Sequence, residues 1–123
     1  SEERLKDYKE KPSRSEQIEV YRLLATQRGL YPCLKYPGVT NVRLNSGEVW
    51  KYGISRHGKN RYPASFYLDN RLSYQTILIT DILEAEQIEK KLIISYPLLP
   101  ECQWRMKQFG IFLKHPPGNT KDM

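Results

Sequence analysis

The stretch YQTILITDILEAEQIEKKLIISYP, Tyr74 to Pro97, places a strand-type run directly before a helix-type run. Residues 74–80, YQTILIT, are rich in aromatic and β-branched side chains and lie between polar turns, which predicts a strand. Residues 81–96 carry apolar side chains at helical spacing, and Pro97 marks the expected end of the helix. A strong strand followed by a strong helix favours an α+β domain.

Further elements are predicted on both sides of this pair. Upstream, SRSEQIEVYRLLATQRG predicts a helix from Ser13 to Gly29, with a serine N-cap and Gly29 as C-cap. Residues 30–35 and 48–54 are β-prone and predict a wide hairpin with a tight turn at residues 45–47. Downstream, a short amphipathic piece covers residues 104–109. We therefore expect a small antiparallel β-sheet of about three strands, flanked by helices.

Length and composition fit a single domain. The chain has 123 residues, of which 39% are hydrophobic and 28% charged. We expect the domain to span residues 13–123, because residues 1–12 alternate charge signs and predict a linker or a frayed N-terminal segment. No run approaches the roughly 20 apolar residues of a membrane span, and the fragment carries no signal-peptide pattern.

The net charge of +6 favours an acidic partner, such as nucleic acid, an acidic protein or an anionic surface. Charge alone does not choose among these. Cys33 and Cys102 lack CxxC spacing and a nearby histidine pair, so they predict no zinc site. We interpret both as small buried hydrophobic side chains.

One carboxylate, that of Glu89, lies on the apolar side of the helix predicted over residues 81–96. On a wheel of about 100° per residue, five apolar side chains fall within about 60° of Glu89, on both sides of it. These are Ile82, Ala85, Leu92, Ile93 and Tyr96. A buried carboxylate costs several kcal/mol unless it is paired, hydrogen-bonded or bound to a metal. Glu89 therefore predicts either a structural ion pair with an arginine or a functional site.

The stretch GEVWKYGISRHGKNRYP, Gly47 to Pro63, turns from a strand into a basic loop. Gly53 inside the strand indicates close approach of a ligand or another backbone. Arg56, Lys59 and Arg61 follow at once and suit phosphate oxygens, although such a loop is equally typical of solvated surface. Aromatic strand residues such as Tyr52 are usually core packing.

The order of several short motifs resembles the GIY-YIG nuclease family, also called the URI superfamily. The two signature triplets are similar to Gly29-Leu30-Tyr31 and Lys51-Tyr52-Gly53, where Lys51 replaces a tyrosine. Arg61 stands eight residues beyond Gly53, at the separation of the family's catalytic arginine. EAEQIEKKLIISY, Glu84 to Tyr96, resembles the family helix whose second glutamate, here Glu89, holds the metal. Pro117-Gly118-Asn119 is similar to the late asparagine element.

The resemblance implies an endonuclease that hydrolyses phosphodiester bonds with little sequence preference and uses Mg²⁺ or Mn²⁺ but no small-molecule cofactor. Glu89 would bind the metal, and Arg61 would cover the charge of the phosphoryl group. Tyr31 or Tyr52 would orient or deprotonate the attacking water, assisted by Lys51 or the metal. His57 is a candidate proton carrier, although an exposed loop histidine is the commoner interpretation. Asn119 would hydrogen-bond a tyrosine or a metal-bound water.

The match is closest to the toxin domains at the C-termini of bacterial polymorphic toxins. It therefore implies an antibacterial effector, secreted within a larger protein and acting in the target-cell cytoplasm, with an acidic immunity protein as partner. Arg56, Lys59 and Arg71 would hold the backbone of nucleic acid, DNA in preference to RNA. The alternative is a non-catalytic basic module that binds nucleic acid or protein, in which Glu89 forms a structural bridge with Arg61.

Overall fold

The computed structural model describes residues 16–34 and 41–120. Its strands are β1 (Ile18–Ala25), β2 (Gly29–Pro32), β3 (Asn41–Leu44), β4 (Val49–Ser55) and β5 (Leu72–Thr80). Its helices are η1 (Gly58–Arg61), α2 (Ala64–Asn70), α3 (Ile82–Ser95), η2 (Tyr96–Leu98) and α4 (Pro100–Phe109), where η marks a 3₁₀ helix. The expected linker over residues 1–12 lies outside the described residues. No helix in the described part of the chain is long and apolar enough to span a membrane.

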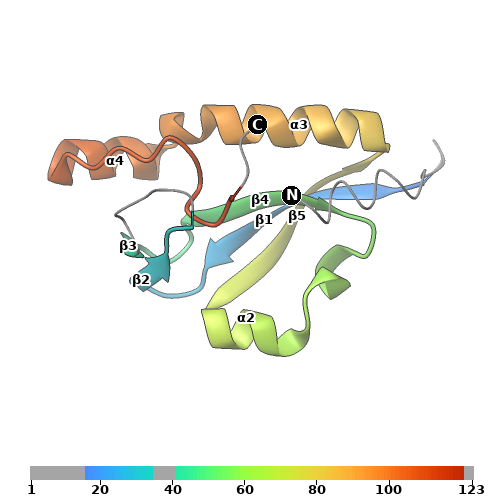
Figure 1. The fold of residues 1–123 in the computed structure, drawn as a ribbon, viewed down its shortest axis with the longest axis horizontal. Coiled ribbons are helices and arrows are strands. Elements are labelled where there is room, and N and C mark those ends of the chain that lie inside the picture. The colour runs from blue at the N-terminus through green and yellow to red at the C-terminus, as the bar shows by residue number, and fades with distance from the viewer. Residues whose placement is uncertain (1–15, 35–40, 121–123) are drawn as a thin grey trace.

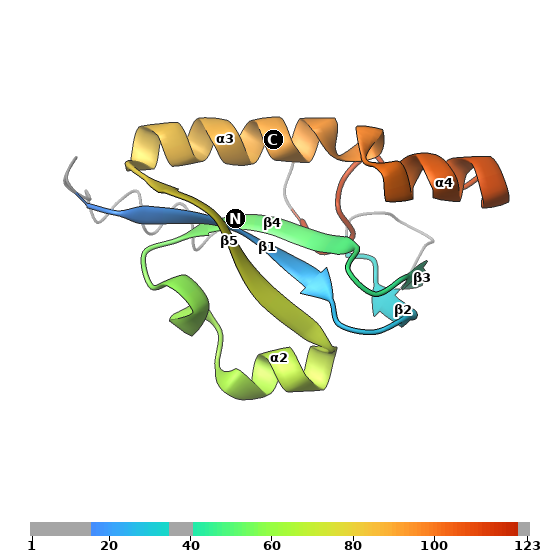
Figure 2. The same cartoon turned by 180° about the vertical axis from the view of Figure 1, so that it is seen from behind.

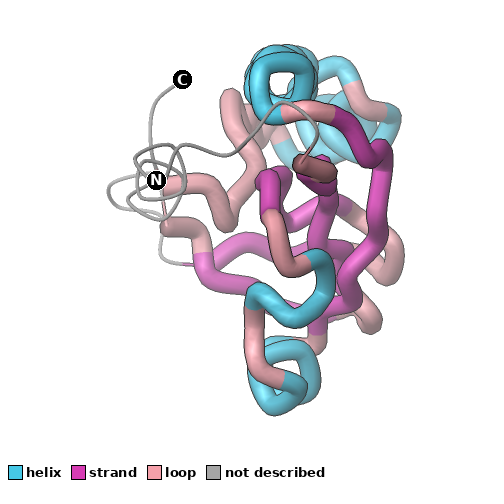
Figure 3. The backbone as a smooth tube through the Cα atoms, turned by 90° about the vertical axis from the view of Figure 1, so that its right-hand side faces the viewer, coloured by secondary structure: helices cyan, strands magenta, loops and turns pink. Residues whose placement is uncertain are grey.

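The main sheet has three strands in the order β4-β1-β5, and both pairings are antiparallel. Strands β2 and β3 form a separate two-stranded sheet. Helix α3 covers one side of the main sheet and α2 lies on the other, so the molecule has three layers (Figures 1 and 3). The reverse view shows β2 and β3 at the α4 end (Figure 2). The predicted α+β class with a small antiparallel sheet is confirmed.

The prediction of a helix over Ser13–Gly29 is wrong, because Ile18–Ala25 within this range form the central strand β1. Tyr21 and Leu23 pack into the larger hydrophobic cluster, whereas Ile18 and Val20 pack with Ala85 of α3. A central strand buried on both faces carries apolar residues at neighbouring positions, which imitates the spacing of an amphipathic helix. Gly29 does not cap a helix but begins β2.

The predicted wide hairpin between residues 30–35 and 48–54 is also wrong. Strand β2 pairs with β3, with Tyr31 opposite Val42, and β4 pairs with β1 instead. The tight turn at residues 45–47 is confirmed as the connection from β3 to β4, where Gly47 has φ of 89°. Positive φ is easy for glycine and rare for other residues. This turn thus connects the two-stranded sheet to the main sheet.

Strand β5 and helix α3 follow the sequence prediction. The side chain of Asp81 caps α3 by accepting a hydrogen bond from the backbone N–H of Glu84 at 2.9 Å. Ala85, Glu89 and Ile93 form the buried line of the helix, and Glu89 is 5% exposed. The predicted burial of this carboxylate is therefore confirmed. Cys33 and Cys102 are buried as well, as expected.

A C-terminal clasp, residues 116–119, covers the outer edge of β4. The N–H of Gly118 donates to the carbonyl of Trp50 at 2.7 Å. The side chain of Asn119 acts as a strand partner, because its Oδ1 accepts from the N–H of Tyr52 at 3.1 Å and its Nδ2 donates to the carbonyl of Tyr52 at 3.0 Å. The clasp satisfies backbone groups that an edge strand otherwise leaves open.

Candidate active site

Tyr21 and Gly53 meet on the side of the sheet that faces α2. They are directly paired between β1 and β4, and a Cβ on residue 53 would lie only 2.4 Å from the hydroxyl oxygen of Tyr21. The tyrosine ring therefore occupies the space that a side chain at position 53 would fill. Close approach explains the glycine within the strand, and the group that approaches is a tyrosine of the central strand.

Tyr62 reaches this ring from the segment after η1. Its hydroxyl oxygen lies 2.8 Å from the hydroxyl oxygen of Tyr21. Lys51 Nζ donates to the same Tyr62 oxygen at 3.1 Å, and Arg61 Nε donates to it at 3.4 Å. We call Tyr21, Lys51, Arg61 and Tyr62 the Tyr62 cluster. It gathers two cations and a neutral donor around one phenol oxygen.

Aromatic rings surround the Tyr62 cluster. Phe66 of α2 stacks on the ring of Tyr62 with centroids 4.3 Å apart, and Tyr74 of β5 stacks on Tyr21 at 4.8 Å. Tyr67 meets the ring of Tyr62 edge-on at 5.9 Å. These rings give the cluster apolar surroundings, and electrostatic interactions are stronger in such surroundings than in water.

The two hydroxyl groups of the cluster differ in acidity. Burial raises the pKa of Tyr21 well above its usual value, and the charge and hydrogen bond of Tyr62 add to that rise. Burial alone would also raise the pKa of Tyr62, but the charge of Lys51 and the hydrogen bonds from Tyr21, Arg61 and Lys51 outweigh it. The pKa of Tyr62 is therefore lowered. Tyr21 remains a neutral donor, and Tyr62 is the group that loses its proton first.

A phenol of lowered pKa beside two cations is suited to general-base chemistry on an anionic substrate. The phenolate form can accept a proton, and the nearby guanidinium and ammonium groups can attract phosphate oxygens. Arg61, Tyr62 and Lys51 are all partly exposed, so solvent reaches the cluster. An open depression of about 420 Å³ lies along α2 and is lined by Thr26, Gln27, Ala64, Tyr67, Leu68, Arg71 and Leu72, so it shares no residue with the cluster.

Glu19 supplies a carboxylate next to the aromatic rings. Its Oε1 accepts hydrogen bonds from the hydroxyl of Tyr74 at 2.9 Å and from the hydroxyl of Thr76 at 2.8 Å. Burial raises the pKa of Tyr74, and Glu19 raises it further. The Oε2 of Glu19 would lie only 2.6 Å from a Cβ atom on residue 58, where the chain has glycine. Glu19 thus holds the hydroxyl of Tyr74, whose ring stacks on Tyr21, and lies close to Gly58 at the start of η1.

The structure brings two of the predicted catalytic residues, Lys51 and Arg61, into the Tyr62 cluster. Tyr31 is placed elsewhere, in the small sheet. Its hydroxyl donates to the carbonyls of Gln27 at 2.7 Å and Arg71 at 3.0 Å, and the Arg71 guanidinium carbon lies 4.4 Å from its ring centroid. Arg71, predicted to bind nucleic acid, also donates to the carbonyl of Leu30. Both side chains therefore serve packing at the β2 end.

Tyr52 points to the opposite side of β4 from Lys51, because successive strand side chains alternate. Burial raises its pKa to about 12, although the charge of Arg22 opposes that rise. Asn119 holds the backbone of Tyr52 with both ends of its amide group. The predicted bond from Asn119 to a tyrosine is thus a bond to the tyrosine's backbone, which places this asparagine in the sheet edge.

The remaining basic residues lie on the loop that follows β4. His57 and Lys59 are exposed. Lys59 Nζ lies 5.9 Å from the ring centroid of Tyr67, and Arg56 Nε lies 3.4 Å from a carboxylate oxygen of Glu16. Arg61 of the Tyr62 cluster lies at the end of the same loop, in η1.

Glu89 approaches the sheet from α3, on the side away from α2 (Figure 1). Its neighbour Ala85 packs with Val20 and Ile54, whereas Tyr21 and Lys51 belong to the other face. Within residues 16–34 and 41–120, no group of three or more His, Cys, Asp or Glu side chains could hold a metal ion. A single carboxylate nevertheless fits Mg²⁺, which keeps several waters and takes substrate phosphate oxygens as ligands.

Tyr21 and Tyr62 are the site residues that the sequence did not indicate. The helix predicted over Ser13–Gly29 contains Tyr21, and only the register of β1 against β4 reveals its pairing with Gly53. Tyr62 directly follows Arg61, and that adjacency was the available signal. Comparison with known proteins adds nothing to this assignment, since no family model, curated protein or solved structure matches the chain.

Proposed function

We propose that the domain is a metal-dependent endonuclease that hydrolyses phosphodiester bonds with little sequence preference. The observation that carries the proposal is the hydroxyl of Tyr62, held by Tyr21 at 2.8 Å and by Lys51 at 3.1 Å, with Arg61 as a second cation. The motif resemblance to GIY-YIG nucleases supports the same reaction: it includes Arg61 of the cluster and adds Glu89.

Tyr62 is the general base in this proposal. Its phenolate accepts the proton of the attacking water, a role that requires a pKa below that of an ordinary tyrosine. Tyr21 keeps its own proton and donates a hydrogen bond that fixes the orientation of the Tyr62 oxygen. The packing of Tyr31 and Tyr52 elsewhere favours Tyr62 over either of them as the base.

Lys51 and Arg61 act twice during the reaction. Before proton transfer their charges stabilise the phenolate, and once Tyr62 becomes neutral the same charges are available to the phosphoryl oxygens. Negative charge develops on those oxygens in the transition state, where preorganised cations are most effective. The planar guanidinium of Arg61 suits two phosphate oxygens at once.

Glu89 is the residue that would hold Mg²⁺. A bound Mg²⁺ supplies Lewis-acid stabilisation of phosphoryl and leaving-group oxygens. Helix α3 and the Tyr62 cluster lie on different sides of the sheet, and the clasp covers the outer edge of β4 beside Trp50 and Tyr52. A metal held by Glu89 would therefore have to reach the substrate beyond the clasp. Arg56 and Lys59 would contact the backbone of the nucleic acid without reading bases.

The decisive experiment compares two tyrosine variants on a supercoiled plasmid with Mg²⁺ and then with EDTA. We expect the wild type to nick the plasmid only with the metal, and Tyr62→Phe to lose about 10²-fold or more in rate. Tyr67→Phe is the matched control, because its hydroxyl donates to the carbonyl of Lys59 and not to the cluster. Equal rates for wild type and Tyr62→Phe would reject the general base.

One observation favours the second candidate, a non-catalytic basic binding module: Glu89 packs from the opposite side of the sheet. Glu89→Gln keeps the shape of the side chain and removes its charge. Loss of nicking with an unchanged unfolding midpoint supports the metal role. Nicking that persists at the wild-type rate removes Glu89 from the site, and binding without any cleavage supports the module.

The proposal extends to an antibacterial toxin domain with an acidic immunity protein, and that part rests on the motif resemblance alone. Induced expression in the bacterial cytoplasm should stop growth. Tyr62→Phe should restore growth at equal protein level, because it removes the general base without emptying the core. Continued toxicity of Tyr62→Phe would separate growth arrest from phosphodiester cleavage.

A further inference from the structure

A second site lies at the other end of the molecule, between β3 and α4. It is a half-enclosed pocket of about 330 Å³. Its polar and aromatic walls come from Arg28, Arg43, Asn45, Trp104, Arg105 and Phe109, and aliphatic side chains complete the lining. None of these residues belongs to the Tyr62 cluster. The volume is at the lower end of the range for small-molecule sites.

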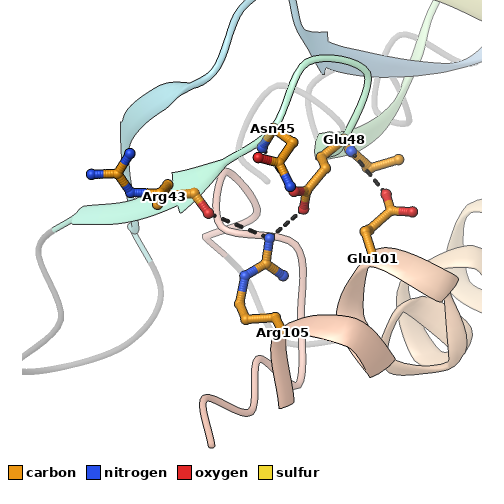
Figure 4. A network of polar contacts seen from close by, with 6 residues as sticks. Arg43, Asn45, Glu48, Glu101 and Arg105 are labelled. Carbon is orange, nitrogen blue, oxygen red and sulfur yellow. Dashed lines mark hydrogen bonds and ion pairs between the residues drawn. The ribbon is translucent and has the colours of Figure 1, made fainter. Parts of the chain in front are cut away.

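A buried ion pair holds Arg105, one of the residues that line the pocket, in place. Arg105 is 3% exposed, and its Nη2 donates to the carboxylate of Glu48 and, at 3.4 Å, to the carbonyl of Arg43 (Figure 4). The other oxygen of Glu48 accepts from the backbone N–H of Asn45 at 2.7 Å. These bonds tie α4 to the turn between β3 and β4, so the side chains that line the pocket have a rigid support.

The open side of the pocket is aromatic. Trp104 and Phe109 meet edge-on with ring centroids 5.5 Å apart. They are 44% and 61% exposed, which is unusual for residues of this size. Trp104 therefore offers exposed indole surface at the pocket, on which a planar ligand could stack. Such faces typically mark binding sites.

The charge of the pocket is positive. Three arginines line it and no acidic side chain does. Glu48 compensates the charge of Arg105, so the exposed side chains of Arg28 and Arg43 carry the positive charge that can attract an anion. The Arg43 side chain points away from Arg105 (Figure 4), so it would meet an anion at the outer side of the site. Asn45 adds a carboxamide, which offers both a donor and an acceptor to a polar ring edge. The ligand that fits is anionic, planar and rich in hydrogen-bonding groups.

We propose that this pocket binds one unpaired nucleotide of a nucleic-acid strand. The base stacks on Trp104, the side chain of Asn45 bonds its edge, and Arg28 and Arg43 bind the adjoining phosphate. A paired base inside a duplex has both faces covered by its neighbours, so the pocket selects single-stranded or frayed nucleic acid. As a substrate preference for the nuclease, this inference rests on the proposed function.

Binding is tested apart from cleavage, with Tyr62→Phe protein in EDTA. Three labelled ligands are compared: a thymidine oligonucleotide of about ten residues, an abasic strand of equal length, and a duplex. We expect the thymidine strand to bind at least about tenfold tighter than the abasic strand and to quench tryptophan fluorescence. Arg43→Ala should lower the salt slope of binding by about one.

Trp104→Ala should weaken thymidine-strand binding about tenfold and leave abasic binding unchanged. Phe112→Ala is the matched control, because Phe112 is 59% exposed but does not line the pocket. Equal affinity for thymidine and abasic strands, or no effect of Trp104→Ala, would overturn the proposal. Quenching by benzoate but not by nucleotides would reassign the pocket to carboxylates. Pocket binding with no cleavage by the wild type would reject only the proposed nuclease.

Discussion

The acidity of Tyr62 depends on a balance between burial and charge. Burial pushes its pKa up, while the ammonium group of Lys51 and three donated hydrogen bonds push it down, and the second effect prevails. A tyrosine is a useful base near neutral pH only under such conditions, since the reference pKa is about 10. Among the influences that lower the pKa of Tyr62, the charge of Lys51 is the largest.

The cleavage rate should accordingly follow the ionisation of Tyr62. The phenolate is the active form, so the rate should rise with pH and level off below the pH expected for an ordinary tyrosine. Lys51→Met removes the largest lowering influence, so the rising limb should move to higher pH and the rate at neutral pH should fall about 10²-fold. Lys51→Arg keeps the cation and serves as control. A pH–rate profile measured in saturating Mg²⁺ provides the comparison.

An unshifted limb in Lys51→Met would mean that Tyr62 is not the titrating base.

At the scale of single residues, the sequence predicts the two cations of the site, Lys51 and Arg61, but not the tyrosines that they contact. Lys51 and Arg61 lie within one short stretch of sequence, two residues before and eight residues after Gly53, and this spacing predicts that both approach one site. Tyr21 comes from another strand, and its contact with Tyr62 spans 41 residues of sequence. No local pattern contains that information.

At the scale of elements, burial decided which predictions held. Helix α3 is half exposed, so its apolar residues repeat at helical spacing and the helix could be recognised. Strand β5 is recognisable from its β-branched run. Strand β1 is covered on both faces and loses the alternation of a half-buried strand. The short helix α2 has no buried residue at all, which leaves no apolar stripe to predict it.

The C-terminal clasp should matter for stability and not for chemistry. Asn119→Ala removes two hydrogen bonds and leaves the N–H and carbonyl of Tyr52 without partners, which should cost about 2 kcal/mol of unfolding free energy. Urea denaturation and hydrogen exchange at the Tyr52 amide measure the effect. Thr120→Ala, at the neighbouring exposed position, should change little. Loss of cleavage at unchanged stability would instead give Asn119 the catalytic role that the resemblance implies.

The Glu48–Arg105 pair joins α4 to the β3–β4 turn. Burial alone would lower the pKa of Arg105, but the hydrogen bond and charge of Glu48 outweigh it and raise that pKa. Glu48→Gln leaves the arginine buried without its counterion and should cost about 3 kcal/mol or more. Replacing both partners by Leu and Met should cost less than Glu48→Gln. Thermal or urea unfolding of Glu48→Leu, Arg105→Met and the double variant, read as a double-mutant cycle, tests the pair.

For the whole molecule, the net charge of +6 predicts how binding responds to salt. Phosphate contacts by Lys and Arg release counterions, so affinity falls as salt rises. With about four such contacts, affinity for a duplex should drop about 10²-fold between about 50 and about 200 mM salt. Fluorescence anisotropy with Tyr62→Phe protein measures the slope. A flat response would show that the basic loop after β4 does not touch the backbone.

The clasp also has a consequence for how the protein is made. Its last contact joins residues 67 positions apart, Tyr52 and Asn119. During translation the open edge of β4 therefore waits for most of the chain to emerge before it can be sealed, since distant contacts form late. The outer edge of β4 can therefore be covered only after residue 119 has left the ribosomal exit tunnel. Until then the nascent polypeptide carries an unpaired strand edge to which a chaperone can bind.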